Sequence, residues 1–336
     1  MDSLSMMHRR TFLKATAAAA TGGLLTACGR EPSAASEAAT SAPAHLDRIG
    51  VNLFTIPHLL EQDFAGAMAK LAGIGYKELE FFGPYPFSVP EVHARWNAVT
   101  GALGFTQSGY FGVSAREVRD LLDGHGLSTP SMHIDLDTLT TRLDNVAEAA
   151  HVLGQRYAGP SAIPAEKRQS LDGYKRTADE FNALGMRMQE VGLQLLYHNH
   201  GYGLVAMEGE IPLQVFIERT DPTYVVLEMD IYWTTAGGAD PIAYLEAYPD
   251  HYRLMHIKDM TEVVRFEGDG GDPQQWIELF PYMADAGSGV LDLPRILATA
   301  RRTGIRHFYL ERDRAEDPDT TLQNSYTFLS TVDLDG

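Results

Sequence analysis

The sequence predicts a single α/β domain with the architecture of a (β/α)8 TIM barrel. From residue 47 onward, short apolar runs alternate with stretches of helical period. Eight such strand–helix pairs follow one another over about 290 residues, which is the count of this barrel. Paired polar residues also close most of the apolar runs, and barrel enzymes place their active sites at such strand ends.

The apolar runs define the expected strands, and the amphipathic stretches define the helices between them. An open doubly wound sheet is the alternative, but it would carry a glycine-rich phosphate turn after the first strand. No such turn follows here, and GDGGDP (268–273) matches no nucleotide fingerprint. We expect strands at 48–56, 76–83, 129–136, 156–162, 193–200, 223–230, 252–259 and 307–313, and helices at 63–75, 114–126, 141–154, 171–191 and 294–304.

Two connections, 84–113 and 260–289, are too long for plain loops between a strand and a helix. Both follow strands, so in a barrel both would overhang the C-terminal face. We expect them to act as lids or substrate walls. A small subsidiary core or a subunit contact is the alternative.

The first residues have the features of a targeting segment. Arg9 and Arg10 begin RRTFLK, an apolar run follows, and LTAC ends at Cys28. Residues 1–28 resemble a twin-arginine export signal that ends in a lipoprotein cleavage box, which would make Cys28 the lipidated residue. Residues 29–46 then form a flexible tether to the barrel domain, 47–336. The protein would be a periplasmic or cell-envelope lipoprotein, held to the membrane only by this anchor. An ordinary cytosolic helix is the alternative.

Charge and cysteine content exclude several classes of protein. The formal net charge is −18, which argues against a nucleic-acid partner because too few cations are present to neutralise phosphates. Cys28 is the only cysteine, so the chain can form no internal disulfide and no thiolate-rich zinc site.

Polar pairs spaced two residues apart fall at the ends of six predicted strands. Side chains at i and i+2 share a face of a strand, so each pair points the same way. Burying so many ionisable groups without a partner would be costly, and a divalent cation is the simplest partner. Imidazole with carboxylate suits Mn, Zn, Co or Fe better than Ca. The pairs are Glu78/Glu80, His133/Asp135, His198/His200, Glu228/Asp230, His256/Lys258 and Glu311/Asp313.

The strand-end residues and the segments around them resemble those of a known family. It looks like the xylose-isomerase-like barrel superfamily, in the branch usually called sugar phosphate isomerase/epimerase. The resemblance covers about residues 47–330. It rests on YKELEFFG, LLYHNHGY, LEMDIYWTTAGGADP, LMHIKDM, GSGVLDLPRILATARRTGIRHFYLERD and DPDTTLQNSYTFL.

The resemblance implies one divalent metal ion held at the ends of strands five to eight. By position the ligands on the last three strands are Asp230, His256 and Glu311. The first ligand is usually a glutamate, but this chain has His198 there. We favour His198 as the fourth ligand, with Glu228 as the alternative. In the family's epimerases that glutamate and the one on strand eight are the two acid/base groups, so one of the two is absent here.

The remaining site residues are assigned by the same resemblance and by residue chemistry. His200 is the expected acid/base group near neutral pH, and Glu311 and Glu228 are further catalytic candidates. Lys258 would polarise a carbonyl or bind a hydroxyl, unless it forms an ion pair with a neighbouring carboxylate. The expected substrate-binding residues are Glu80, His133 and Trp233, the last of which could equally be packed in the wall.

We therefore expect a metal-dependent isomerase or epimerase that moves a proton through an enediolate on a carbohydrate. The missing glutamate weakens the case for epimerisation. It favours isomerisation, or dehydratase or lyase chemistry on 3-keto-glycosides. Export favours a non-phosphorylated substrate. Two competing functions are a metal-dependent hydrolase or endonuclease and a non-catalytic sugar-binding lipoprotein. Barrels of this kind often pair through their outer helices, so a homodimer is a further expectation.

Overall fold

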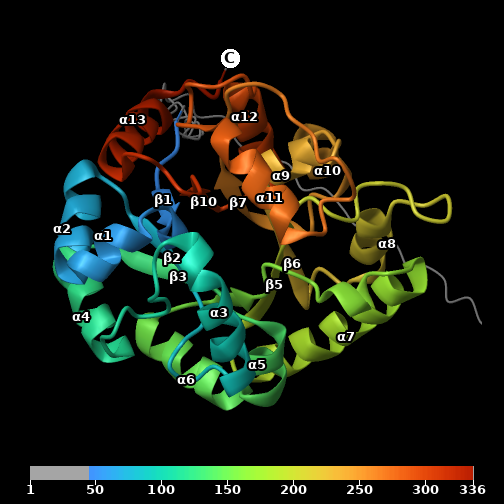
Figure 1. The fold of residues 1–336 in the computed structure, drawn as a ribbon, viewed down its shortest axis with the longest axis horizontal. Coiled ribbons are helices and arrows are strands. Elements are labelled where there is room, and N and C mark those ends of the chain that lie inside the picture. Colours follow the sequence, from blue (N-terminus) through green and yellow to red (C-terminus); the bar gives the residue numbers. More distant parts are fainter. Residues whose placement is uncertain (1–44, 336) are drawn as a thin grey trace, which may run out of the picture. The chain divides into compact units, whose positions relative to one another are not determined.

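Eight parallel strands form a closed barrel in the computed structural model, which describes residues 45–335. The order around the barrel is β1-β10-β7-β6-β5-β4-β3-β2, and helices surround the ring of strands (Figure 1). This confirms the predicted (β/α)8 barrel. The barrel strands are β1 (Ile49–Asn52), β2 (Glu78–Phe82), β3 (Ser128–His133), β4 (Tyr157–Gly159), β5 (Gln194–His198), β6 (Val225–Asp230), β7 (Tyr252–Ile257) and β10 (His307–Leu310).

The helices pack their apolar faces on the outside of this ring. In α12, for example, Leu293, Ile296, Leu297 and Ala300 recur at helical spacing and are all buried. Serine or aspartate caps many of the helix N-termini, as Ser114 does with Glu117 in a capping box. The longer helices are α2 (Phe64–Ile74), α3 (Pro90–Leu103), α4 (Ala115–His125), α6 (Leu143–Leu153), α7 (Leu171–Glu190), α8 (Pro212–Arg219), α12 (Leu293–Thr303) and α13 (Pro318–Thr331). The shorter ones are α1 (Pro57–Gln62), α5 (Leu136–Thr141), α9 (Ile231–Ala236), α10 (Pro241–Ala247) and α11 (Pro273–Leu279).

Inside the barrel an apolar layer lies beneath a polar one. Leu196, Val226, Leu254 and Tyr309 form a buried cluster together with Tyr157. Alternation along a strand puts the residue two positions further on at the same face, one layer nearer the C-terminal end. The residues two positions after the four named first are His198, Glu228, His256 and Glu311. The strand period therefore places these donors above a packed apolar floor.

Strand β4 is short, and glycine allows it to pair closely with β5. A Cβ on Gly159 would lie 1.6 Å from the backbone oxygen of Leu196, so a larger residue could not occupy this position without moving a strand. The close pairing of β4 with β5 helps to fix the height of His198 in the ring.

Two of the predicted elements end differently in the structure. The predicted first strand (48–56) stops at Asn52, whose side chain accepts a hydrogen bond from the Phe54 amide at 2.8 Å and starts a 3₁₀ helix, η1 (Leu53–Thr55). The predicted helix at 141–154 is α6, which begins at Leu143 after the separate short helix α5. In both places a local side-chain or backbone contact outweighs the apolar pattern.

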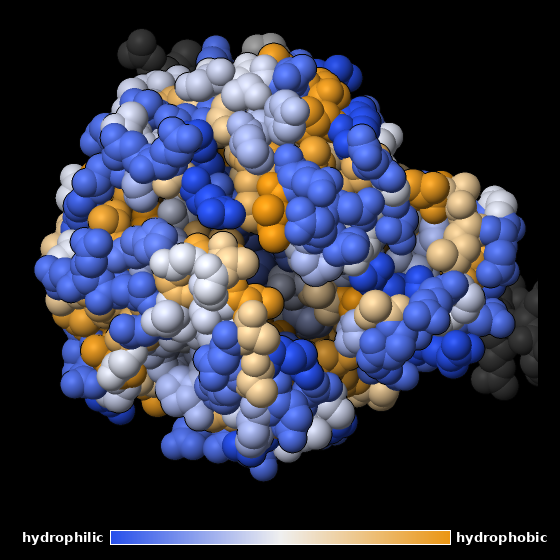
Figure 2. Space-filling model, in the orientation of Figure 1, coloured by the Kyte–Doolittle hydropathy of each residue, from blue (hydrophilic) through white to orange (hydrophobic). Residues whose placement is uncertain are grey.

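The two long connections contain secondary structure of their own. Residues 84–113 carry α3, and residues 260–289 carry α11, the 3₁₀ helix η3 (Phe280–Tyr282) and β9 (Met283–Ala284), which pairs with β8 (Asp259–Met260). A third 3₁₀ helix, η2 (Ala165–Lys167), follows β4. Figure 2 shows the face of the molecule that carries α3 and α11: it is mostly hydrophilic and is hollowed near its centre.

The N-terminal predictions lie outside the described residues. This holds for the export signal, for Cys28 and for most of the tether. Leu46 at the end of the tether is buried, so the packed part of the chain includes it. None of the helices within residues 45–335 is both long and apolar enough to cross a membrane.

Candidate metal centre

The four predicted metal ligands lie together at the C-terminal ends of four neighbouring strands. His198 and Asp230 are the last residues of β5 and β6, His256 is next to last in β7, and Glu311 directly follows β10. Strand register puts Asp230 beside His256. One donor atom from each of the four residues lies within 4.8 Å of the others, and we call these residues the outer donor set.

The geometry of the outer donor set fits a divalent cation. His198 Nε2 lies 3.3 Å from Asp230 Oδ2, and His256 Nδ1 lies 2.6 Å from Glu311 Oε2 and 3.9 Å from Asp230 Oδ2. Donors bound tetrahedrally at about 2.1 Å from an ion are separated by about 3.4 Å, so small movements would suffice. Two imidazoles and two carboxylates suit Zn, Mn or Co. In addition, His198 Nδ1 is buried and has no hydrogen-bond partner within residues 45–335.

A second group of donors lies on the side of His256 that faces away from Glu311. His256 Nε2 lies 2.6 Å from Glu80 Oε2 and 3.3 Å from Glu228 Oε2, and His133 Nε2 lies 2.7 Å from Glu228 Oε2. Glu80, His133, Glu228 and His256 also bring donor atoms within 4.8 Å of one another. We call them the inner donor set. The two sets share His256 and use its two different ring nitrogens.

Lys258 supplies the positive charge nearest to these carboxylates. Its Nζ lies 2.7 Å from Glu311 Oε2, 2.7 Å from Asp313 Oδ2 and 3.2 Å from Asp230 Oδ2. Burial alone lowers the pKa of Lys258, but the three carboxylates outweigh burial and raise that pKa well above its usual range. The ion pair expected as the alternative role of Lys258 is therefore present, and the ammonium stays charged.

The titration of the histidines differs with their surroundings. Burial lowers the pKa of His256, but Glu228, Glu311 and Glu80 reverse this and raise it well above the usual range. Burial and the positive charge of His256 lower the pKa of His198 well below its usual range. His198 is thus held as a neutral imidazole, which is the form that binds a metal ion.

His200 lies beside the outer donor set and is firmly oriented. Its ring stacks on Trp276 with centroids 4.5 Å apart, and its Nδ1 lies 2.6 Å from the backbone oxygen of Ser161. A carbonyl oxygen can only accept, so Nδ1 carries the proton and Nε2 has the free lone pair. Burial, followed by the charge of Lys258, lowers the pKa of His200 to about 3, which corrects the expectation that this ring titrates near neutral pH.

The other predicted site residues are packed inside the protein. Glu80 and Glu228 are fully buried, and His133 is 8% exposed. Trp233 is 1% exposed and stacks on Phe266 at 5.7 Å, so its ring forms part of the wall in this structure.

One member of the predicted polar pairs lies at the other end of the barrel, which corrects the expectation that every pair reaches the C-terminal end of its strand. A second member, Asp135, lies at the expected end but outside both donor sets. Glu78 is the first residue of β2 and contacts Arg48 and His307 at 2.8 Å each, at the opposite end of the barrel. Asp135 caps helix α5 through the Thr138 amide. Strand alternation gives the face of a residue, but it does not give its height or show where a strand ends.

Several residues that contact the inner donor set, Lys258 or His200 were given no role from the sequence. Asp313 pairs with Lys258, and the i, i+2 spacing from Glu311 was the signal for it. Asn52 and Ser131 hydrogen-bond to Glu80 from the neighbouring strands β1 and β3. Trp276 comes from α11 in a long connection, and no periodic pattern marks it.

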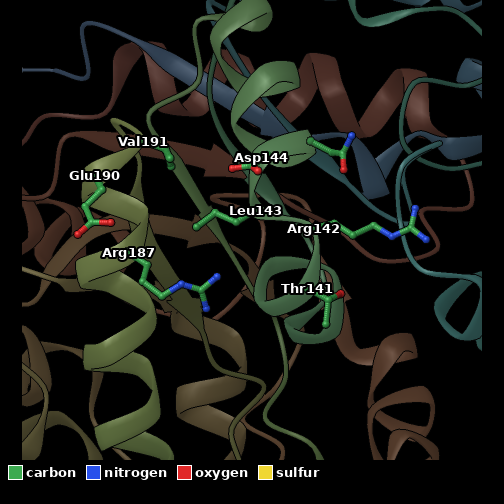
Figure 3. Close-up of a pocket in the computed structure, with 8 residues that line it drawn as sticks. Thr141, Arg142, Leu143, Asp144, Arg187, Glu190 and Val191 are labelled. Carbon is green, nitrogen blue, oxygen red and sulfur yellow. The ribbon is translucent and has the colours of Figure 1, made fainter.

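A cavity of about 300 Å³ lies apart from these donors. It is lined by residues 141–145 and by Arg187, Glu190 and Val191, and Figure 3 shows the side chains around it. None of the strand-end donors lines it, so it is separate from the candidate metal centre.

Comparison with known proteins agrees with this fold. The chain is 31% identical over 117 residues to inosose dehydratase of Lacticaseibacillus casei, a match that covers 35% of this chain and 38% of the relative. It matches a sugar phosphate isomerase/epimerase of Parabacteroides distasonis over 87% of this chain and 95% of that one, at 21% identity and a TM-score of 0.63. The IOLI protein with a binding zinc atom matches with a TM-score of 0.59 at 14% identity, over 85% and 99% of the two chains.

A family comparison assigns the chain as a whole. Residues 68–331 match the family described as xylose isomerase-like TIM barrel, which is most of the chain. The closed eight-stranded barrel and the buried histidines and carboxylates at its strand ends agree with that match. The chain therefore belongs to the xylose isomerase-like TIM barrel family.

Proposed function

We propose that the protein is a metal-dependent sugar isomerase or epimerase that moves a proton at the carbon beside the carbonyl of a non-phosphorylated sugar or keto-sugar. The observation that carries the proposal is the outer donor set at the strand ends, with Lys258 and His200 beside it. Similarity to inosose dehydratase and to sugar phosphate isomerase/epimerase supports sugar or polyol chemistry in a broader sense.

In this proposal His198, Asp230, His256 and Glu311 hold one divalent ion, Mn, Zn or Co. The bound ion supplies Lewis-acid stabilisation of negative charge on a substrate oxygen. Glu311 Oε2 is already shared between His256 Nδ1 and Lys258 Nζ, which favours a ligand role for this carboxylate. Glu228 is fully buried against His133, so we assign it a supporting role.

His200 is the proposed base. Its neutral ring offers Nε2 as a proton acceptor, since Nδ1 donates to Ser161. The low pKa of His200 keeps the ring unprotonated before substrate binds. Stacking on Trp276 fixes the direction of the lone pair.

Lys258 is the proposed proton and hydrogen-bond donor. Its ammonium remains charged because three carboxylates surround it. A fixed cation beside a carbonyl oxygen stabilises the negative charge that develops there when the neighbouring carbon loses its proton. In isomerisation Lys258 would give a proton to the carbonyl oxygen, and His200 would return the carbon proton to the adjacent carbon. Lys258 would then recover a proton from the hydroxyl on that carbon, which becomes the new carbonyl.

Dehydration is the second candidate, and the similarity to inosose dehydratase favours it. Here His200 takes the proton beside the carbonyl, a C–O bond at the next carbon breaks, and the hydroxide leaves as water with a proton from Lys258. His198 stands where the resemblance places a second glutamate base, and elimination needs only one base on the carbon.

The test is a screen of ketoses, inososes and 3-keto-glycosides in D2O with the metal-loaded protein. An isomerase or epimerase would give a new isomer with deuterium beside the carbonyl, observed by NMR. A dehydratase would release one water and form an absorbing enone. His200→Ala and Lys258→Met should each lower turnover by about 10²–10⁴-fold. Absence of both exchange and turnover, in protein that binds the ion, would contradict the proposal.

We also propose that the protein is exported by the twin-arginine route and anchored at Cys28. An enzyme in that location meets few sugar phosphates, so non-phosphorylated compounds should react better than their phosphates. Labelling cells with a radioactive fatty acid checks the anchor: the wild type should take up label and Cys28→Ser should not. Equal labelling of both proteins would refute the anchor.

A further inference from the structure

The two donor sets compete for His256. A neutral imidazole has one lone pair in the ring plane, so it can bind an ion through Nδ1 or through Nε2 but not through both. Nδ1 belongs to the outer set and Nε2 to the inner set. The surroundings of the two nitrogens therefore decide where an ion binds.

Glu80 is placed to make that decision. Its Oε2 lies 2.6 Å from His256 Nε2, and the side chain is completely buried. An ionised carboxylate can only accept hydrogen bonds, so when an ion takes the place of the proton between Nδ1 and Glu311, the remaining proton of His256 lies on Nε2. Nδ1 would then carry the lone pair, directed to the side of Asp230 and Glu311.

Other side chains hold Glu80 in this position. Asn52 Nδ2 donates to Oε2 at 2.9 Å, and the Ser131 hydroxyl donates to Oε1 at 2.7 Å. The same hydroxyl is 2.9 Å from that of Tyr309, inside the apolar floor. With His256 Nε2, three donors from barrel strands contact this one carboxylate and leave it little freedom to turn toward an ion.

Two members of the inner set lie short of their strand ends. Glu80 is in the middle of β2 and Glu228 is two residues before the end of β6, whereas His133 is the last residue of β3. Substrate reaches a barrel site from the strand ends, and a catalytic ion needs an open coordination position there.

The two histidines of the outer set also differ on their far sides. His256 has Glu80 behind it, whereas His198 Nδ1 has no hydrogen-bond partner within residues 45–335. Metal-binding histidines usually donate their other N–H to a carboxylate or carbonyl, which fixes the tautomer and raises ligand basicity. In this centre His256 has such a carboxylate partner for its second nitrogen, and His198 has none within residues 45–335.

We propose that Glu80 is the positioning residue of the metal centre: it receives the Nε2 proton of His256 and thereby directs Nδ1 to the outer donor set. This inference rests on the proposed function only in so far as both require an ion in the outer set. It gives Glu80 a role in metal binding in place of the substrate-binding role expected from the sequence.

The test compares Glu80→Gln with Glu78→Gln in the full chain. Both residues are buried glutamates on β2, but Glu78 contacts Arg48 and His307 at the opposite end of the barrel. Ion content per chain and the dissociation constants for Mn²⁺ and Zn²⁺ would be measured by chelator competition, without substrate. Proton-coupled ¹⁵N NMR of labelled histidine would report the tautomer of His256, and circular dichroism would confirm folding.

The expected result is one ion per chain in all three proteins, with affinity about 10–100-fold weaker in Glu80→Gln and unchanged in Glu78→Gln. In the wild type loaded with Zn²⁺, the His256 proton should lie on Nε2. Unchanged affinity in Glu80→Gln would overturn the inference. So would two ions in the wild type and one in Glu80→Gln, because the inner set would then bind an ion itself. A wild type that binds no ion would instead overturn the proposed function together with this inference.

Discussion

Lys258 shows how one buried charge organises the site. The side chain is 1% exposed and touches three carboxylates, Asp230, Glu311 and Asp313. Burial raises the pKa of Asp313 to about 6, against the opposing effect of Lys258. The lysine therefore compensates a site that contains more negative than positive groups, and its loss should affect folding as well as catalysis.

Lys258→Met should lower the free energy of unfolding by about 3–5 kcal/mol, because buried carboxylates would lose their partner. Urea unfolding measures the change. Lys70→Met is the matched control: Lys70 pairs with Asp319 on the surface, so its loss should cost no more than about 1 kcal/mol. Equal effects of the two substitutions would contradict the assigned role of Lys258.

His256 makes ion binding depend on pH. Its pKa is raised well above the usual range because, although burial lowers it, Glu228, Glu311 and Glu80 outweigh burial. Below that raised pKa the ring is protonated, and binding of an ion must displace the proton from Nδ1. The apparent affinity should therefore rise about tenfold per pH unit for one displaced proton. Isothermal titration with Mn²⁺ between about pH 6 and 8 checks this, and a flat profile would contradict it.

At the scale of elements, the strands were predictable because the apolar runs are dense and regular. Every predicted strand except the first overlaps the observed one with both ends within about three residues, and β6 and β7 are the clearest cases. The helices α3 and α11 were not predicted, because aromatic and polar residues interrupt their periodicity. The height of Glu78 in the barrel was not predictable either, since alternation repeats at every level of a strand.

Asp259 fixes a segment in which the apolar periodicity predicted no helix or strand. Its buried carboxylate accepts backbone N–H bonds from Met260 and Leu291 on one oxygen and from Gly287 and Gly289 on the other, at 2.8–3.1 Å. The segment before α12 is thereby tied to the end of β7. This contact supports the strand that carries His256.

Asp259→Asn should lower the free energy of unfolding by roughly 2–4 kcal/mol, because an amide can satisfy only one pair of these N–H groups. Thermal and urea unfolding measure the loss. Asp123→Asn is the control, since Asp123 is exposed and pairs with Arg119 one helical turn away. The assigned role would be contradicted if both substitutions changed stability equally.

At the scale of the whole molecule, an ion in the outer donor set would connect strands far apart in the sequence. His198 is at the end of β5 and Glu311 directly follows β10. Strands β6 and β7 lie between β5 and β10 in the barrel. An ion that binds only the folded chain at 100 times its dissociation constant adds about 2.7 kcal/mol. Melting temperature should then rise by roughly 4–5 °C for a domain of this size. No rise in saturating Mn²⁺, Zn²⁺ or Co²⁺ would contradict this.

The most direct test of the central claim is the metal content of the purified full chain, measured beside His256→Ala and His307→Ala. His307 is a control on the same barrel, since it contacts Glu78 at the end away from the donor sets. We predict one transition-metal ion per chain in the wild type and in His307→Ala, and none in His256→Ala. No bound ion in the wild type, even after dialysis against Mn²⁺, Zn²⁺ and Co²⁺, would contradict the account and leave a non-catalytic sugar-binding protein as the better explanation.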